Sequence, residues 1–128
     1  MARILVIDDD PALRGSVRRA LERFGHQITE AENGIEGMRQ VRRDAPDLVI
    51  TDLLMPEQEG IETIQELREE FPEIRILAVS GAGGVEEGGP LLDAQLFGAD
   101  ATLSKPFSVE LLVKTVEGVL EGEGEGGG

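Results

Sequence analysis

Four short apolar runs, each followed at once by a polar residue, constrain the fold of this chain most. They span residues 4–7, 48–50, 76–79 and 101–103. Each has the length and the continuous hydrophobicity of a strand buried on both faces, which is typical of a parallel sheet. A further run over residues 26–31 is less hydrophobic and alternates, so we expect an edge strand there.

Segments with a helical period separate these runs, because their apolar residues recur at spacings of three and four. The expected apolar positions are Leu13, Val17, Ala20, Leu21 and Phe24, then Ile35, Met38 and Val41, then Ile61, Ile64, Leu67 and Phe71, then, weakly, Leu91, Leu92 and Leu96, and last Val109, Leu112, Val116 and Val119. Asp10 before Pro11 is expected to cap the first helix, and Ser108 the last. A strand followed by a helix, five times over, predicts a doubly wound α/β fold with a five-stranded parallel sheet and helices on both faces.

The length of 128 residues leaves room for one domain of ordinary size, and a hydrophobic content of 40% is enough for its core. We expect that domain over residues 1–120 and a disordered Glu/Gly-rich tail over residues 121–128. The absence of cysteine excludes disulfides, a thiolate nucleophile and a cysteine zinc site. Apolar runs of four or five residues are too short for a membrane span or a signal peptide, so we expect a cytoplasmic protein without a membrane partner.

The charge is strongly negative and unevenly distributed. The formal net charge is −14, with +1 on residues 1–43 and −15 on residues 44–128. Such a surface repels phosphate backbones, so we expect no nucleic-acid partner. A highly charged surface most simply keeps a protein soluble, and attraction of a basic partner is the alternative.

The polar residues that follow the strands are the candidate site. In open parallel sheets, ligands bind beyond the carboxyl ends of the strands. Polar residues there commonly cap the next helix, but Asp10 is expected to fill that role for the first helix, which leaves its two acidic neighbours without an evident structural role. Clustered carboxylates repel one another unless a cation is present, and an all-oxygen ligand set favours Mg²⁺ or Mn²⁺. The residues expected to converge are Asp8, Asp9, Asp52, Ser80 and Lys105.

This set of groups suits phosphoryl transfer. A divalent ion and the Lys105 ammonium would neutralise the phosphoryl oxygens while a carboxylate attacks phosphorus to form an aspartyl phosphate. Ser80 would donate a hydrogen bond to a phosphoryl oxygen that is present only after transfer, so its position would report the modification. The sequence therefore predicts a switch.

These motifs resemble the receiver domain of two-component response regulators. The resemblance covers residues 3 to about 120, and four motifs in the right order on the right strand ends make it specific. The motifs are residues 4–11 (ILVIDDDP), residues 52–56 (DLLMP) with Gly60, residues 79–81 (VSG), and residues 98–100 (GAD) followed by residues 105–107 (KPF). The resemblance implies the flavodoxin-like strand order 2-1-3-4-5.

The resemblance also implies a role for each site residue. Asp52 would be the phosphoacceptor, Asp8 and Asp9 would organise Mg²⁺ with the backbone carbonyl of Leu54, and Ser80 and Lys105 would contact the phosphoryl group. The bond between Lys105 and Pro106 would be cis. The phosphoryl donor would be a sensor histidine kinase or a histidine phosphotransfer protein, and phosphorylation would switch a surface that binds a downstream protein. Such a protein is not an enzyme beyond its own phosphorylation and slow dephosphorylation.

The chain departs from the family at two places. Thr102 stands where most receivers carry an aromatic residue in the fifth strand, and the glycine-rich stretch over residues 81–90 is longer than typical. We expect that stretch to be a mobile loop, and its ordering is a hypothetical route for the signal.

Three further features receive structural interpretations. His26, the only histidine, is expected to be structural or exposed. The four arginines of the first helix are expected on a solvated face, with kinase docking as the alternative that the resemblance implies. All four phenylalanines are expected in or at the edge of the core. The residues concerned are Arg14, Arg18, Arg19 and Arg23, and Phe24, Phe71, Phe97 and Phe107.

Two other functions compete with the receiver interpretation. Residues 7–10 also resemble the opening of haloacid dehalogenase phosphatases, which would make Asp8 the nucleophile and Asp10 the acid. The chain is short for that family, and the motif at Asp52 would go unexplained. The other alternative is a receiver-like interaction module that is never phosphorylated.

Overall fold

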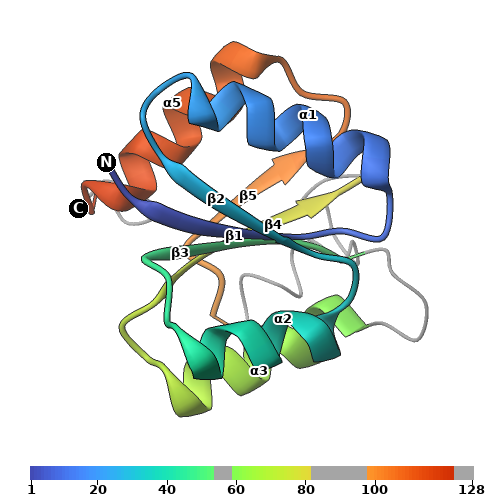
Figure 1. Ribbon diagram of the computed structural model, residues 1–128, viewed down its shortest axis with the longest axis vertical. Coiled ribbons are helices and arrows are strands. Elements are labelled where there is room, and N and C mark those ends of the chain that lie inside the picture. Colours follow the sequence, from blue (N-terminus) through green and yellow to red (C-terminus); the bar gives the residue numbers. More distant parts are fainter. Residues whose placement is uncertain (54–58, 82–97, 123–128) are drawn as a thin grey trace.

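The computed structural model describes residues 1–53, 59–81 and 98–122. Strands and helices follow one another along the chain as the apolar pattern predicts (Figure 1). The elements are β1 (Arg3–Ile7), α1 (Pro11–Glu22), β2 (Gln27–Ala31), α2 (Gly34–Arg43), β3 (Leu48–Asp52), α3 (Glu59–Glu70), β4 (Arg75–Ser80), β5 (Ala101–Ser104) and α5 (Val109–Leu120).

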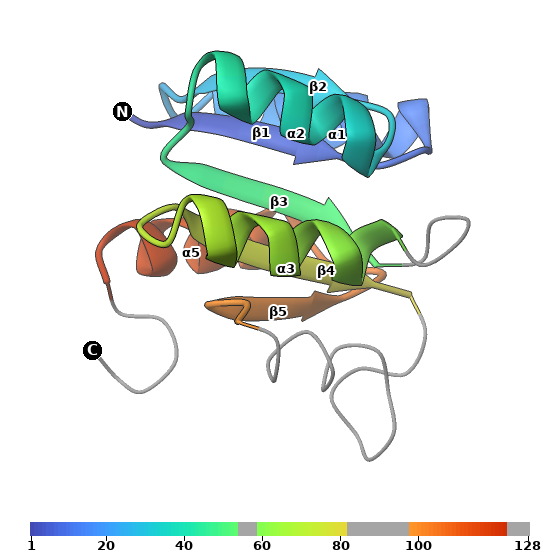
Figure 2. The ribbon, with the colours of Figure 1, turned by 90° about the horizontal axis from the view of Figure 1, so that it is seen from below.

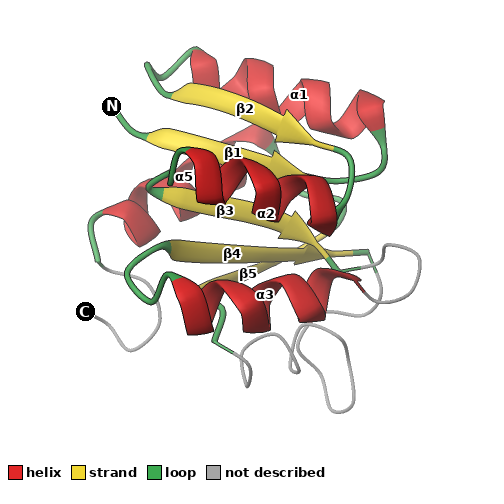
Figure 3. Cartoon of the chain, turned by 60° about the horizontal axis from the view of Figure 1, so that its bottom comes forward, coloured by secondary structure: helices red, strands yellow, loops and turns green. Residues whose placement is uncertain are grey.

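The five strands form one parallel sheet in the order β2-β1-β3-β4-β5, which confirms the expected fold class (Figure 3). The chain first adds β2 on one side of β1 and then adds the remaining strands on the other side. The strand order therefore reverses between β1 and β3, and the carboxyl ends of all five strands lie along one edge of the sheet.

The sheet lies between two helical layers. Helices α1 and α5 cover one face, and α2 and α3 cover the other (Figures 1 and 2). Successive residues of β1 enter opposite cores: Ile4 and Val6 pack beneath α1 and α5, whereas Leu5 and Ile7 pack beneath α2 and α3. A strand buried on both faces has to be apolar throughout, which explains the continuous runs in the sequence.

The caps expected for the first and last helices are present. The Asp10 carboxylate accepts hydrogen bonds from the N–H groups of Ala12 and Leu13, and Pro11 occupies the first helical position. The Ser108 hydroxyl accepts a hydrogen bond from the Leu111 N–H at the start of α5. These oxygens satisfy N–H groups that have no partner within the helix.

Arg68 fixes the chain at the start of β5. Its guanidinium donates hydrogen bonds to the Gly98 carbonyl at 2.8 Å and to the Asp100 carboxylate at 2.6 Å. The same Asp100 oxygen accepts the Ile76 N–H at 2.7 Å. These bonds join α3, β4 and the segment that leads into β5, so they set the position from which β5 runs to the candidate site.

His26 has the structural role that the sequence favoured. Its side chain is buried, and Nδ1 accepts the Ala2 N–H at 3.0 Å. Because Nδ1 accepts, Nε2 carries the ring proton and donates it to the Glu117 carboxylate at 2.9 Å. The imidazole thus links β1 to α5 at the edge of the sheet opposite the candidate site.

Two apolar residues do not lie where the helical pattern predicts. Phe24 is 56% exposed because α1 ends before it, and Ile35 is 69% exposed. The buried stripe of α2 includes Gly34, Gly37, Met38 and Val41, and Ile35 lies off that stripe. Phe71 and Phe107 do pack against the two cores, as expected.

Several expectations fall outside the described residues. They are the weak helix around residues 91–96, Phe97, the glycine-rich stretch beyond Gly81 and the tail from residue 123 onward. Among the described helices, none has the length and apolar character needed to cross a membrane.

Candidate functional site

Three carboxylates come together at the carboxyl edge of the sheet. Asp8 and Asp9 follow β1, and Asp52 ends β3, the neighbouring strand. One carboxylate oxygen from each lies within 4.8 Å of the others. Asp8 and Asp52 are each only 4% exposed, whereas Asp9 is exposed to solvent. The structure thus brings together the acidic residues that the sequence placed on two separate strand ends.

Lys105 reaches this cluster from the end of β5. Its Nζ donates a hydrogen bond to Asp52 Oδ2 at 3.1 Å and lies 3.4 Å from Asp8 Oδ2. The Lys105 N–H also donates to the Ser80 carbonyl at 2.8 Å, which holds the backbone against β4. The bond between Lys105 and Pro106 is cis, as the resemblance implied.

Ser80 and Leu54 complete the predicted set. Ser80 ends β4, between Asp52 and Lys105 in the order of the sheet, and its side chain is fully buried. Leu54 lies outside the described residues. All five predicted side chains, those of Asp8, Asp9, Asp52, Ser80 and Lys105, therefore lie at one edge of the sheet. The predicted carbonyl ligand, that of Leu54, belongs to a residue that the structure does not describe.

Asp8 has a structural role that the sequence did not indicate. Its Oδ1 accepts the Asp10 N–H at 2.9 Å, which closes a short turn after β1. Its own N–H donates to the Ala31 carbonyl at 3.1 Å and extends the pairing with β2. The expectation that Asp8 lacks a structural role was wrong, because an Asp side chain readily bonds the backbone two residues ahead.

The surroundings of the site disfavour the ionised form of Asp8 and favour the protonated form of Lys105. Burial raises the pKa of the Asp8 carboxyl, and the nearby Asp52 carboxylate raises it further, although the Asp10 N–H and Lys105 oppose this shift. Burial by itself would lower the pKa of Lys105, but its contacts with Asp52 and Asp8 outweigh burial and raise it. One ammonium thus faces three carboxylates, and a divalent cation would neutralise the excess negative charge.

The donor set fits Mg²⁺. All of the clustered ligand atoms are carboxylate oxygens, and hard oxygen ligands without sulfur or imidazole suit Mg²⁺, with Mn²⁺ as the alternative. Two of the three carboxylates are buried and fixed by hydrogen bonds. A cation would therefore find a site that is largely formed.

Replacing Asp8 by asparagine is expected to stabilise the protein without divalent ions at neutral pH. Because the folded state raises the pKa of Asp8, its ionisation opposes folding, and an uncharged amide can still accept the Asp10 N–H. We expect the free energy of unfolding at pH 7.5 in EDTA to rise by more than about 0.5 kcal/mol, the range of ordinary surface substitutions. Urea denaturation measures this difference.

The pH dependence and one control variant test the cause. Neutral Asp8 contributes its full stabilisation below the pKa that this carboxyl has in the unfolded chain, and that stabilisation is lost as pH rises through its pKa in the folded protein. The difference in the free energy of unfolding between Asp8→Asn and the wild type should therefore shrink as pH falls towards about 4. Glu69→Gln removes the same charge from an exposed position on α3 and should change stability little. An equal gain in both variants would attribute the effect to net charge instead.

Gly60 allows α3 to approach the candidate phosphoacceptor. A Cβ at this position would lie 2.5 Å from the Asp52 carbonyl oxygen and 2.7 Å from the Leu53 Cα. Both are backbone atoms, so Gly60→Ala should force α3 away from β3 and lower the free energy of unfolding by about 1–3 kcal/mol. Gly118→Ala in α5 is the matched control, because among the described residues no atom outside the neighbouring backbone of α5 lies within 4 Å of its added Cβ, and the helix should gain about 1 kcal/mol. Equal urea midpoints for the Gly60 variant and the wild type would contradict this account.

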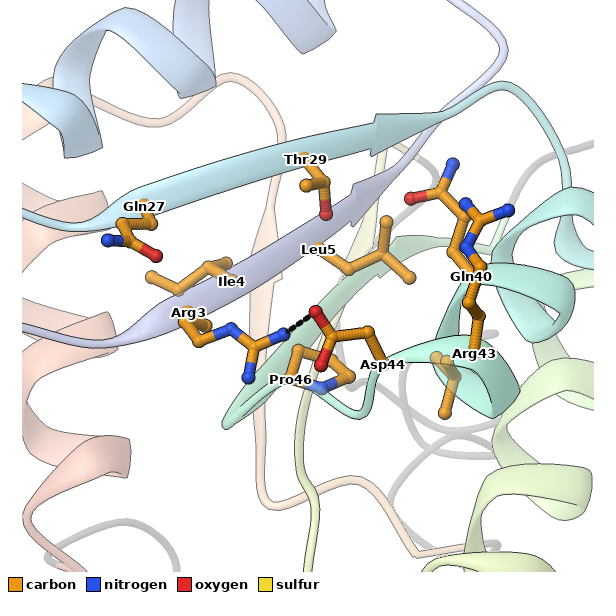
Figure 4. A pocket seen from close by; sticks show the side chains of 10 residues that line it. Arg3, Ile4, Leu5, Gln27, Thr29, Gln40, Arg43, Asp44 and Pro46 are labelled. Atoms are coloured by element: carbon orange, nitrogen blue, oxygen red, sulfur yellow. Dashed lines mark ion pairs between the residues drawn. The ribbon is translucent and has the colours of Figure 1, made fainter.

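A cavity elsewhere in the molecule does not contain the candidate residues. It has a volume of about 230 Å³ and lies between β1, β2 and α2 (Figure 4). Arg3, Gln27 and Gln40 are among its lining residues, and Asp44 on its rim is ion-paired with Arg3. None of the clustered carboxylates lines it. This cavity is therefore separate from the candidate site.

Sequence reasoning missed the position of Arg14. We expected the arginines of α1 on a solvated face, but Arg14 and Arg18 are half-buried and both bind the Glu30 carboxylate on β2. Arg14 also donates a hydrogen bond to the Asp8 carbonyl. The periodicity of α1 could not reveal these contacts, because they depend on how α1 packs against β1 and β2. Arg19 and Arg23 are exposed as expected.

Comparisons with known proteins agree with this geometry. The family model described as the response regulator receiver domain matches residues 4–117. The response regulator MprA of Mycobacterium leprae (strain TN) is 38% identical over 118 residues, which cover 92% of this chain and 50% of that protein. The chain thus spans about half the length of the curated relatives that it matches.

Solved structures show the same fold. A two-component response regulator of the LuxR family from Aurantimonas sp. SI85-9A1 superimposes with a TM-score of 0.86 at 33% identity, covering 95% of this chain and 86% of that one. The chemotaxis response regulator CheY4 of Vibrio cholerae gives a TM-score of 0.85 at 28% identity, with coverage of 93% and 98%.

Proposed function

This chain belongs to the response regulator receiver family, and from that premise we propose that Asp52 accepts a phosphoryl group from a phosphohistidine in a reaction that requires Mg²⁺. Response regulators receive phosphate from histidine kinases, so the donor is a sensor histidine kinase or a histidine phosphotransfer protein. The observation that supports Asp52 most directly is its burial beside the Lys105 ammonium at 3.1 Å. In that position the Lys105 ammonium would stabilise the negative charge of a phosphoryl group transferred to Asp52.

The transfer is a single nucleophilic substitution at phosphorus. A carboxylate oxygen of Asp52 forms the new O–P bond, the P–N bond to the donor imidazole breaks, and its electron pair stays on the imidazole nitrogen, which takes up a proton. Lys105 stabilises the phosphoryl oxygens through its ammonium, and Ser80 donates its hydroxyl to one of them. Asp8, Asp9, Asp52 and the Leu54 carbonyl would hold Mg²⁺, whose positive charge neutralises the transferring group.

The geometry supports Asp52 as the acceptor over Asp8. Asp8 Oδ1 already accepts the Asp10 N–H, and the raised pKa of Asp8 disfavours its ionised, nucleophilic form. The phosphatase alternative needs Asp8 in that role and is not favoured by the family match. The alternative of an unphosphorylated module is also not favoured, since the chain retains the acidic residues, the serine and the lysine of the site.

The wider role follows from the family and from the charge of the chain. Receiver domains are generally not enzymes in the usual sense, and we expect only self-phosphorylation and slow dephosphorylation here. We infer that phosphorylation switches a surface for a downstream protein, in the cytoplasm where response regulators typically act. Thr102, which is half-buried in β5, stands where most receivers carry an aromatic residue. Any switching at this position therefore proceeds without an aromatic side chain. The absence of a nucleic-acid partner remains a prediction from the net charge of −14.

The test is covalent labelling with a small donor. The protein is incubated with acetyl phosphate and Mg²⁺, and intact-mass and peptide mapping locate the label. We expect one phosphoryl group on Asp52, absent when EDTA replaces Mg²⁺. A label on Asp8 would support the phosphatase alternative, and no label from either acetyl phosphate or a cognate kinase would leave the interaction module.

A further inference from the structure

Arg14 connects three parts of the molecule beside the candidate site. It lies in α1, and its Nη1 donates to the Asp8 carbonyl at the end of β1 at 2.6 Å. Its Nε donates to Glu30 Oε1 on β2 at 2.9 Å. The Arg14 side chain is only 17% exposed, so the guanidinium is held between the helix and the two strands.

Glu30 holds this guanidinium in place. Its second oxygen accepts a hydrogen bond from Arg18 Nη1 at 2.9 Å, so both carboxylate oxygens are engaged. Hydrogen bonds from Arg18 and Arg14 lower the pKa of Glu30, which keeps the carboxylate charged at neutral pH. The two arginines therefore share one fixed anion, but only Arg14 extends from it to the backbone of the site.

The contact with the Asp8 carbonyl fixes the peptide plane that joins Asp8 to Asp9. On the other side of Asp9, the bond from the Asp10 N–H to the Asp8 side chain fixes the peptide that joins Asp9 to Asp10. Asp9 is exposed, so packing does not hold its side chain. The direction of the Asp9 carboxylate therefore depends on the backbone that these two bonds hold.

We propose that Arg14 is a positioning residue for the candidate metal site: anchored by Glu30, it holds the Asp8 carbonyl and so orients the carboxylates of Asp8 and Asp9 towards a shared cation. The inference rests on the proposed function, because it assumes that these carboxylates bind a divalent ion. Groups that orient metal ligands from outside the ligand set typically change affinity strongly when they are removed.

The test compares two arginine variants in binding Mn²⁺, which prefers the same oxygen ligands as Mg²⁺. Electron paramagnetic resonance of free Mn²⁺ gives the dissociation constant for the wild type, Arg14→Ala and Arg18→Ala, and thermal unfolding is measured alongside. We expect Arg14→Ala to weaken Mn²⁺ binding about tenfold or more. Arg18→Ala should leave the dissociation constant unchanged, although both variants lose a bond to Glu30 and should unfold at lower temperatures.

A conservative variant separates positioning from charge. Arg14→Lys keeps the positive charge but cannot hold the Asp8 carbonyl and Glu30 in the same fork geometry, so its affinity should also fall. It also serves if Arg14→Ala does not fold. Unchanged Mn²⁺ affinity in the folded Arg14 variants, or equal losses in the Arg14 and Arg18 variants, would overturn the inference. Failure of the wild type itself to bind Mn²⁺ would overturn the metal-dependent function, and this inference with it.

Discussion

Asp52→Asn is expected to abolish Mg²⁺-dependent phosphorylation by acetyl phosphate. The amide has nearly the same shape as the carboxylate and can still accept the Lys105 hydrogen bond, so the fold should be retained. It lacks the anionic oxygen that would attack phosphorus, and it also removes one charged ligand of the candidate metal site. Intact-mass measurement over a time course should show complete labelling of the wild type and none of the variant.

A matched variant tests whether the loss is specific to Asp52. Asp44→Asn changes the same chemical group at an exposed position beyond α2, far from the clustered carboxylates, and should label like the wild type. If Asp52→Asn were still labelled, and if that labelling still required Mg²⁺, another residue would be the acceptor. Peptide mapping would then identify it.

Lys105→Met is expected to separate phosphoryl transfer from metal binding. The ammonium contacts two of the three clustered carboxylates and competes with a divalent cation for their charge. Without it, Mn²⁺ should bind at least as tightly as to the wild type. The rate of phosphorylation at saturating Mg²⁺ should nevertheless fall about 100-fold or more, as is common when a charge-stabilising donor is removed.

Lys114→Met is the natural control, because Lys114 is the other lysine of the chain and is exposed on α5. It should change neither quantity. A Lys105 variant that is phosphorylated at the wild-type rate would show that the lysine serves only to compensate the buried carboxylates. Weaker Mn²⁺ binding in that variant would show instead that Lys105 is needed to form the metal site.

Local patterns predicted the features that depend on neighbours in the chain. The apolar runs located the strands because a strand buried on both faces must be apolar throughout, and Asp10 and Ser108 identified helix starts because capping uses residues two or three positions ahead. The family resemblance supplied the strand order, which the structure confirms. The convergence of Asp8 and Asp52 then follows, since their strands are adjacent and parallel.

Patterns failed where the outcome depends on packing between distant segments. The pairing of Arg14 with Glu30 joins residues 16 positions apart through the docking of α1 on β2, and no periodicity within α1 distinguishes Arg14 from Arg19. Phe24 has the spacing of a core residue, but the helix ends before it. The bond from Asp8 to the Asp10 N–H is local, but it uses a conformation of the turn that three consecutive aspartates do not specify.

The bonds of Arg68 and Asp100 secure the chain where it enters β5. At the other end of this strand the Lys105 N–H donates to the Ser80 carbonyl, and β5 is paired with β4 along its whole length. The backbone of β5 is thus held at both ends, whereas the Lys105 ammonium reaches Asp52 through a long, flexible side chain. A change in charge at Asp52 would therefore be followed first by the Lys105 side chain, and β5 would keep the ammonium within reach of the acceptor.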